Sequence, residues 1–308
     1  MIINTGQRTD IPAFYSKWFV NRLKAGYVLV RNPYNPGSVI RYRLSPDTVD
    51  GIGFCTKNPA PMLPHMDLLK PYGQFWYVTI TPYGREIEPR VPRKTEVLDS
   101  FRRLSDIAGI DSVGWRYDPI FVSDAYPVER HLKAFEYMAN ALSGYTRIAV
   151  ISFIDLYRKT RRNFPEVRAV SAADRLTLGK AFIEIGRRYG MTIRPCAEGD
   201  ELAPFGADTS GCMTAGIYEQ AFRTSLKIPA RSRARKECVC YLGADIGAYN
   251  SCGHLCRYCY ANYDAEAVRR NMEAHDPGSP LLIGHLLPGD QVRDAVQTSW
   301  KNPQLSML

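Results

Sequence analysis

Short apolar runs alternate with polar turns and with longer segments of helical periodicity along most of the chain. Each short run ends in polar residues, proline or glycine, as a buried strand does where the chain returns to the surface. A further β-like stretch, Val39–Leu44, is expected as an insertion after the second run. The pattern predicts eight strands: Met1–Asn4, Gly26–Val30, Gly51–Phe54, Phe75–Ile80, Ser112–Trp115, Arg147–Phe153, Met191–Arg194 and Pro280–Gly284.

The longer segments carry apolar residues at helical spacing. The clearest of them is Ala172–Tyr189, with Ser171 at the position of a helix N-cap and Gly190 where helices commonly end. Further helices are expected at Ile11–Leu23, Lys94–Ala108 and Val128–Leu142.

Eight strands with interposed helices in a chain of 308 residues predict a (β/α)8 TIM-type barrel, complete or distorted. A doubly wound parallel sheet is the alternative. We expect residues 1–200 and 278–308 to form the α/β barrel. A cysteine-rich segment, residues 201–277, would be inserted before the last strand, and the whole would be one compact unit.

The predicted strand ends are rich in ionisable and hydrogen-bonding side chains. Barrels carry their catalytic residues at these ends, although any one of the side chains is as readily a turn or capping residue. Candidate acid–base and orienting residues are Asp10, Lys57, Asp118, Asp155 and Glu198. Candidate cofactor-binding residues at the same ends are Arg8, Asn58, Thr81 and Arg116.

Composition is that of a soluble globular protein, with 45% hydrophobic and 23% charged residues. The chain has no apolar run long enough to span a membrane, and its N-terminus lacks the features of a secretory signal. We therefore expect a cytoplasmic protein with no membrane partner. In the cytoplasm its eight cysteines would be metal ligands or free thiols and not disulfides.

The formal net charge is +9, and two basic runs, Tyr157–Arg162 and Arg231–Lys236, hold much of the excess. Such runs are usually solvated faces. A nucleic-acid substrate or an anionic small molecule would also explain them.

The strongest chemical signal lies near the C-terminus, where Cys252, Cys256 and Cys259 form a C-x3-C-x2-C array. Three thiolates so close in sequence can converge on one metal centre, either an iron–sulfur cluster or zinc. A cluster held by three thiolates leaves one iron open for another ligand. The zinc alternative would recruit His254 as a fourth ligand. Tyr258 and Asn262, within and just after the array, are further candidates for binding a cofactor.

Four other cysteines, Cys196, Cys212, Cys238 and Cys240, would complete a second [4Fe–4S] cluster or an all-cysteine zinc site. The plain alternative for Cys196 and Cys212 is that they are buried small residues. Cys55 remains, and is expected to be a packed thiol.

Six segments spread along the chain carry a resemblance to a known family: Arg8–Ala13, Thr56–Pro59, Thr81–Gly84, Trp115–Pro119, Asp245–Gly247 and Cys252–Asn262. Together they resemble one uncharacterised bacterial family, a domain of unknown function with a C-terminal cysteine array similar to that of radical S-adenosylmethionine (SAM) proteins. The resemblance runs through nearly the whole chain and implies a cluster without naming a reaction. The array also resembles, locally, the cluster loop of spore photoproduct lyase, but the DNA-repair activity of that enzyme is not inferred for this chain.

The expected function is an iron–sulfur enzyme of the radical-SAM type. A [4Fe–4S] cluster on the array would bind SAM at its open iron and cleave it to start radical chemistry on an unidentified substrate. A ferredoxin or flavodoxin would supply the electron. Arg116 would pair with the carboxylate of SAM, and Asp118, Asp155 or Glu198 with its ammonium group.

The chain departs from radical-SAM enzymes in two ways. The array falls between the seventh and eighth predicted strands and not after the first, and no clear Gly-Gly-Glu segment is present to hold the amino group of SAM. Two alternatives therefore stay open. One is an iron–sulfur enzyme that works without SAM, as a Lewis acid or electron relay, and the other is a zinc-stabilised module that binds nucleic acid.

Overall fold

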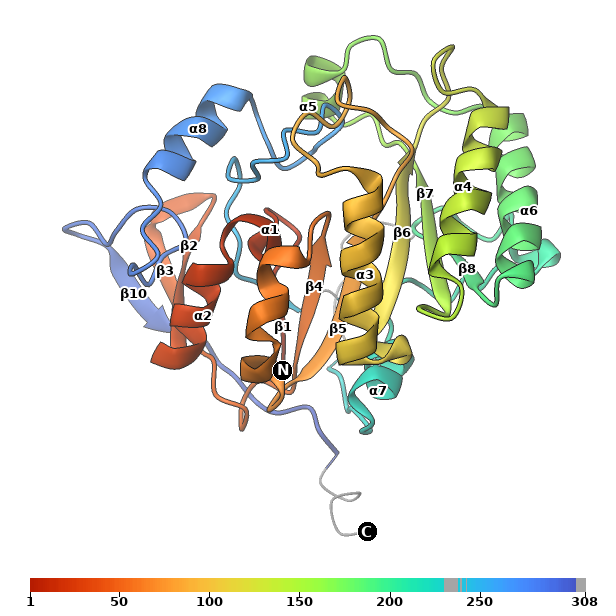
Figure 1. Ribbon diagram of the computed structural model, residues 1–308. Coiled ribbons are helices and arrows are strands. Elements are labelled where there is room, and N and C mark those ends of the chain that lie inside the picture. The colour runs from red at the N-terminus through yellow and green to blue at the C-terminus, as the bar shows by residue number, and fades with distance from the viewer. Residues whose placement is uncertain (230–237, 239, 242, 303–308) are drawn as a thin grey trace.

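The computed structural model describes residues 1–229, 238, 240–241 and 243–302 (Figure 1). Within them, seven parallel strands form one open sheet in the order β8-β7-β6-β5-β4-β1-β9. Neighbouring strands from β1 to β8 follow chain order, and β9 is added beside β1. The strands are β1 (Ile2–Asn4), β4 (Gly51–Thr56), β5 (Gly73–Thr79), β6 (Val113–Ile120), β7 (Ile148–Phe153), β8 (Thr192–Pro195) and β9 (Ala244–Asp245).

The predicted barrel is wrong, because β8 and β9 lie at opposite edges of the sheet, which is therefore not closed. Two of the eight expected strands belong elsewhere. The run at Gly26–Val30 is part of β2 (Tyr27–Asn32), which pairs antiparallel with β3 (Asn35–Arg43) in a separate three-stranded sheet with β10 (Gln291–Asp294). The run at Pro280–Gly284 contributes only an isolated bridge between Leu29 and Leu281. The fold is an open α/β sheet with Rossmann-like layers.

The helices follow the sequence pattern closely. The expected bounds of Lys94–Ala108 and Val128–Leu142 are confirmed. Ser171 caps the helix Ala172–Arg188 by accepting a hydrogen bond from the Asp174 amide. Tyr15 divides the helix expected at Ile11–Leu23 into two. The α-helices are α1 (Ile11–Phe14), α2 (Ser16–Ala25), α3 (Lys94–Ala108), α4 (Val128–Leu142), α5 (Arg158–Asn163), α6 (Ala172–Arg188), α7 (Ala215–Phe222) and α8 (Ala265–Glu273). Shorter 3-10 segments are η1 (Ala60–Leu69), η2 (Ile110–Ser112) and η3 (Ala203–Phe205).

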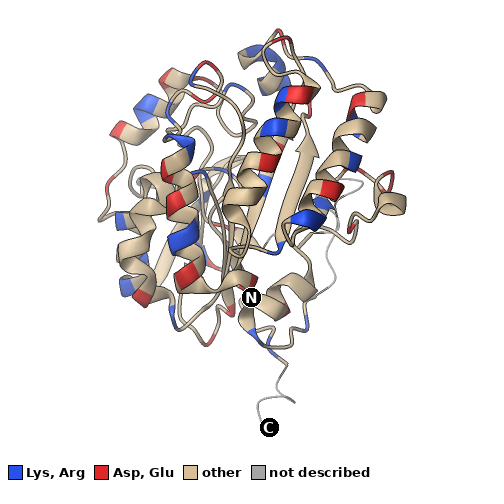
Figure 2. Ribbon diagram, turned by 45° about the vertical axis from the view of Figure 1, so that its right-hand side comes forward, with Lys and Arg blue, Asp and Glu red and all other residues tan. Residues whose placement is uncertain are grey.

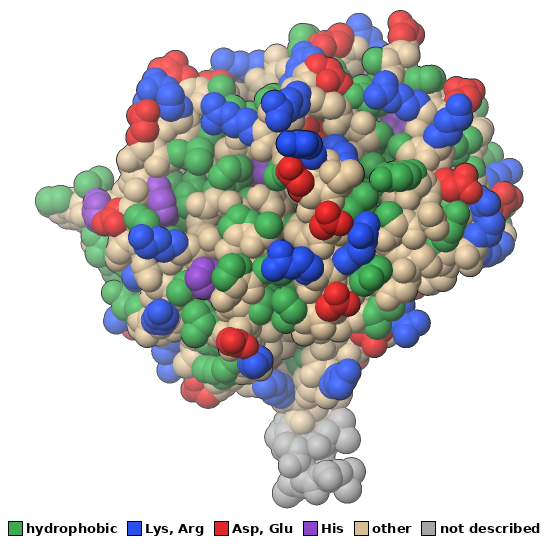
Figure 3. Space-filling model, in the orientation of Figure 1, with side chains coloured by type: hydrophobic (Ala, Val, Ile, Leu, Met, Phe, Trp, Pro, Cys, Tyr) green, Lys and Arg blue, Asp and Glu red, His purple; other side chains and the backbone are tan. Residues whose placement is uncertain are grey.

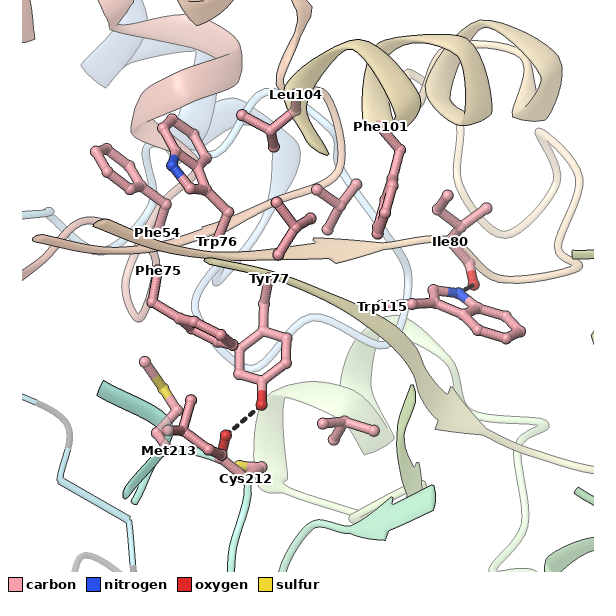
Figure 4. Close-up of a cluster of buried hydrophobic side chains, with 14 of the residues drawn as sticks. Phe54, Phe75, Trp76, Tyr77, Ile80, Phe101, Leu104, Trp115, Cys212 and Met213 are labelled. Carbon is pink, nitrogen blue, oxygen red and sulfur yellow. Dashed lines mark hydrogen bonds between the residues drawn. The ribbon is translucent and has the colours of Figure 1, made fainter. Parts of the chain in front are cut away.

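Aromatic side chains fill both faces of the sheet (Figure 4). On one face Trp76 stacks on Phe54 with ring centroids 3.6 Å apart, on the side covered by α3. On the other face Phe75 and Tyr77 point toward the segment that carries Cys212, whose carbonyl accepts a hydrogen bond from the Tyr77 hydroxyl. Strands buried on both faces are expected in a parallel sheet, and here they fix the strand ends that surround the site.

The surface carries charges of both signs. Lys and Arg alternate with Asp and Glu along the outer helices (Figure 2) and are interspersed over the face shown in Figure 3. Within the described part of the chain, each helix is too short or too polar to cross a membrane.

Candidate functional site

A cavity of about 1410 Å³ lies at the carboxyl ends of the parallel strands. Its wall includes residues in the last part of β6 and residues that follow β1, β4, β7 and β8. All eight cysteines of the chain line this cavity, although they are spread from residue 55 to residue 259. The carboxyl ends of parallel strands are where open α/β proteins bind ligands.

Cys252, Cys256 and Cys259, hereafter the triad, lie on one loop at the wall of this cavity. Hydrogen bonds hold the loop closed: the Asn262 side chain donates to the Cys252 carbonyl at 2.8 Å, and the Asn250 amide donates to the Ala261 carbonyl at 3.1 Å. The loop is also anchored to the N-terminal part of the chain, because the Tyr15 hydroxyl donates to the Ser251 carbonyl at 2.6 Å.

Cys256 is buried, and Cys252 and Cys259 are partly buried. Burial, Asp10 and the other two cysteines raise the pKa of Cys252 well above its ordinary value. Burial also raises the pKa of Cys256 to about 12, although the Lys57 ammonium opposes this change. The Ala261 amide donates to the sulfur of Cys259 at 3.3 Å. Amide donors of this kind are typical of sulfur atoms that ligate a metal.

Cys196, Cys212, Cys238 and Cys240, hereafter the four-cysteine group, line the same cavity. Cys212 Sγ lies 3.3 Å from Cys196 Sγ and 3.2 Å from Cys240 Sγ. Cys238 is close enough to Cys240 for a hydrogen bond that raises the pKa of Cys238. Among the described residues, no group of three or more His, Cys, Asp or Glu side chains is arranged so that it could hold a metal ion. The two groups of thiols are nevertheless the donor sets that an iron–sulfur cluster and a zinc ion require.

Glu88 is a central residue of the site that the sequence did not reveal. Its carboxylate is 1% exposed, and it accepts hydrogen bonds from Lys57 Nζ at 2.8 Å and Thr81 Oγ1 at 2.6 Å. Lys94 and the hydroxyl of Tyr258 bind the same carboxylate. Burial alone would raise the pKa of Glu88, but the two ammonium groups outweigh burial and hold the pKa at about 2.

This network is connected to the triad loop through Tyr258, which lies between Cys256 and Cys259 in the sequence. The Lys57 ammonium also lies 5.5 Å from the centre of the Tyr258 ring. Glu88 lies in the loop after β5 and outside every motif, so only the fold connects it with the cysteines.

Asp10 and His254 form a second support. Asp10 is 4% exposed, and its Oδ2 lies 2.9 Å from His254 Nε2 and accepts from the Lys57 amide at 2.7 Å. His254 Nδ1 lies 3.4 Å from the Arg90 carbonyl. Both nitrogens of His254 are thus engaged away from the triad, which weighs against His254 as a zinc ligand in this arrangement.

The other candidate acid–base residues are separated. Asp118 is paired with Arg116, and both line the cavity on the side of the four-cysteine group. Asp155 lines the cavity and accepts a hydrogen bond from the Tyr157 hydroxyl at 3.0 Å. Glu198 lies behind the wall, where its carboxylate accepts from the Phe153 amide at 2.8 Å and burial raises its pKa to about 7.

The candidate cofactor-binding residues also divide. Arg8 and Tyr258 line the cavity, and Arg8 is paired with Asp245 at 3.1 Å. Asn58 and Thr81 lie outside the lining, where Asn58 accepts from the Ala60 amide at 3.2 Å and Thr81 binds Glu88. Asn262 is likewise buried behind the triad loop. These three residues support loops and do not face the cavity.

Of the two basic runs, the first forms the start of α5, and its Arg158 and Lys159 line the cavity beside the triad. Lys159 Nζ lies 4.8 Å from the centre of the Tyr249 ring. The second run, Arg231–Lys236, falls outside the described residues.

Fold and site together define an open α/β protein whose strand ends enclose a cysteine-lined cavity. Residues 2–261 match the family described as a domain of unknown function, DUF1848. The chain belongs to this family, as the resemblance in its motifs indicated. Comparison with curated proteins and with solved structures gives no match.

Proposed function

We propose that the chain is an iron–sulfur enzyme of the radical-SAM-like type, with a [4Fe–4S] cluster held by Cys252, Cys256 and Cys259. The observation that carries the proposal is the position of the triad, which lies on one loop at the wall of a cavity of about 1410 Å³. Three thiolates leave one iron of a cubane without a protein ligand, and here that iron would face the cavity.

The surroundings of the triad favour a cluster over a structural zinc ion. A structural zinc site needs four protein ligands, whereas the fourth ligand expected from the sequence, His254, is bound to Asp10 and to the Arg90 carbonyl. Burial raises the pKa of Cys259, and the amides of Ala261 and Asn262 together with the partly buried ammonium groups of Lys159 and Lys57 act against this rise. Positive charge beside the sulfurs would stabilise an anionic cluster.

The cavity is large enough for SAM and a substrate together, since typical ligand pockets measure roughly 300–1,000 Å³. When bound, such a cluster supplies the electron that cleaves SAM to a 5′-deoxyadenosyl radical. The protein would orient the bound molecules and exclude water. Arg158 and Asp155 line the wall and would pair with charges on a bound ligand. Arg8 and Arg116 line it as well, but each would first have to exchange its ion pair, with Asp245 and Asp118 respectively, for the ligand. The substrate is either a small molecule or a nucleic acid, and a ferredoxin or flavodoxin would supply electrons.

The test uses protein purified and reconstituted without oxygen. Iron and sulfide are counted per chain, and spectra of the dithionite-reduced protein are recorded with and without SAM, with assay of 5′-deoxyadenosine. The key variant replaces all three triad cysteines by serine, and the matched control is Cys55→Ser, which changes a thiol of the same cavity outside both groups. We expect about four irons per chain that the triple variant loses and the control retains.

The outcomes separate the alternatives. A spectral response to SAM with formation of 5′-deoxyadenosine supports the proposal in full. Iron on the triad without any response to SAM rejects the SAM-dependent reaction and favours the electron-relay or Lewis-acid enzyme. Wild-type protein that binds zinc at the triad and no iron overturns the proposal.

A further inference from the structure

The four-cysteine group differs from the triad in one respect that bears on the identity of its metal. Three of its sulfurs lie close together, with Cys212 Sγ 3.3 Å from Cys196 Sγ and 3.2 Å from Cys240 Sγ. Zinc binds four thiolates at about 2.3 Å in a tetrahedron, which places the sulfurs about 3.8 Å apart. The two short distances therefore need to grow by only about half an ångström to match those of a zinc site, and Cys238, which is within hydrogen-bonding reach of Cys240, would supply the fourth sulfur.

A cubane cluster would demand a much larger rearrangement. Its four cysteine sulfurs bind four different irons, so they stand far apart around the whole cluster. The loops here leave little freedom for such a change. The Tyr77 hydroxyl donates to the Cys212 carbonyl, and the Tyr241 amide donates to the Met213 carbonyl at 2.8 Å. The Tyr218 hydroxyl also binds the Tyr241 carbonyl at 3.2 Å.

The electrical surroundings suit a tetrathiolate zinc complex, which carries a formal charge of about −2. Arg116 lies 5.5 Å from the centre of the Tyr77 ring and is held by Asp118 at the cavity wall. Arg194, which is paired with Asp208 at 2.5 Å, donates to the carbonyl of Gly211, the neighbour of Cys212, at 2.8 Å. The Met213 amide donates to Cys240 Sγ at 3.3 Å, as amides commonly do to zinc-bound sulfur.

We propose that Cys196, Cys212, Cys238 and Cys240 bind one structural zinc ion that ties together the two edges of the open sheet. Cys196 follows the edge strand β8 directly, and Cys238 and Cys240 precede the opposite edge strand β9. The zinc ion would fix the connection between these edges and so hold β9 and the triad loop, which follows it, against the strand ends. This assignment is independent of the reaction proposed for the triad.

The test begins with the variant in which the three triad cysteines are serine, purified from zinc-supplemented cells. We expect about one zinc per chain, and an X-ray absorption spectrum with about four sulfurs at about 2.3 Å. Cys212→Ser in the same background should lose the zinc, whereas Cys55→Ser should keep it. If Cys212→Ser does not fold, cobalt exchanged into the parent variant provides the check, through the visible bands of a tetrahedral cobalt thiolate.

Three results would overturn the zinc assignment. The first is about four irons and sulfides on the variant that lacks the triad, which would mark a second cubane. The second is zinc bound by fewer than four sulfurs. The third is metal-free protein in which thiol titration shows Cys196 and Cys212 joined as a disulfide. Failure of the proposed cluster would instead appear in wild-type protein as missing triad iron, with the zinc unchanged.

Discussion

Replacing Glu88 by glutamine tests the view that a buried carboxylate supports the triad loop. The variant keeps the shape of the side chain but leaves Lys57 and Lys94 without their shared counter-ion. The pKa of Glu88 falls from 4.5 to about 2 on folding. That difference corresponds to about 3 kcal/mol of stability at neutral pH.

The direction of the pH dependence follows from the lowered pKa. The stabilisation is fully present above the unfolded pKa of 4.5 and is lost as the pH falls toward about 2. The difference in unfolding free energy between wild type and Glu88→Gln should therefore shrink from about 3 kcal/mol at pH 7 to about 1 kcal/mol at pH 3.

Urea unfolding followed by circular dichroism measures this difference. With a slope of about 3 kcal/mol per molar for a chain of this size, the midpoint should fall by about 1 M at pH 7. The matched control is Glu96→Gln, which removes the same charge from an exposed ion pair with Arg93 and should shift the midpoint by less than about 0.2 M. Iron content is measured on every sample so that occupancy is equal. Equal shifts for the two variants would refute the reasoning.

Two further substitutions follow from the structure. Burial raises the pKa of Glu198 from 4.5 to about 7. The stabilisation contributed by the protonated Glu198 carboxyl is therefore fully present below pH 4.5 and is lost as the pH rises through 7. The unfolding free energy of Glu198→Gln should therefore match that of wild type near pH 4 and exceed it by about 2–3 kcal/mol at pH 8. A difference between the two unfolding free energies that stays constant over this pH range would contradict the assignment. Gly243→Ala should cost more than Gly26→Ala, because both glycines have positive φ but only the new Cβ at residue 243 would lie 2.6 Å from the Ile2 carbonyl. Equal losses in thermal stability for the two variants would show that the strain of a positive φ, and not the close contact with Ile2, determines the loss.

Much of the sheet could be predicted because its strands are apolar on both faces and end in polar turns. β4, β5, β7 and β8 lie close to the expected runs, whereas β6 continues to Ile120, past the expected end at Trp115. The barrel was wrong because an apolar pattern identifies a strand without identifying the sheet that it joins. A local signal was present at Asn32–Asn35, where a short turn with Pro33 joins two alternating runs and marks a hairpin instead of a βαβ unit.

The site was predictable only where the chemistry is encoded in spacing or residue type. The cysteines are of this kind, and the structure gathers all of them at one cavity. Glu88 has no such signal, since it follows Ile87 and precedes Pro89 in a charged loop. Thr81 and Asn58 follow strands, but side-chain direction depends on packing, which turns Thr81 toward Glu88 and Asn58 toward the Ala60 amide.

The order of the segments along the chain determines when each part of the cavity is synthesised. The strand ends that form its floor lie before residue 200, whereas the triad loop comes after residue 249. A domain generally folds as a unit, and here the sheet includes β9, which comes late in the chain, just before the triad loop. The cavity is therefore completed only after most of the chain has been made. Metal would be loaded after that point, as a final step of maturation.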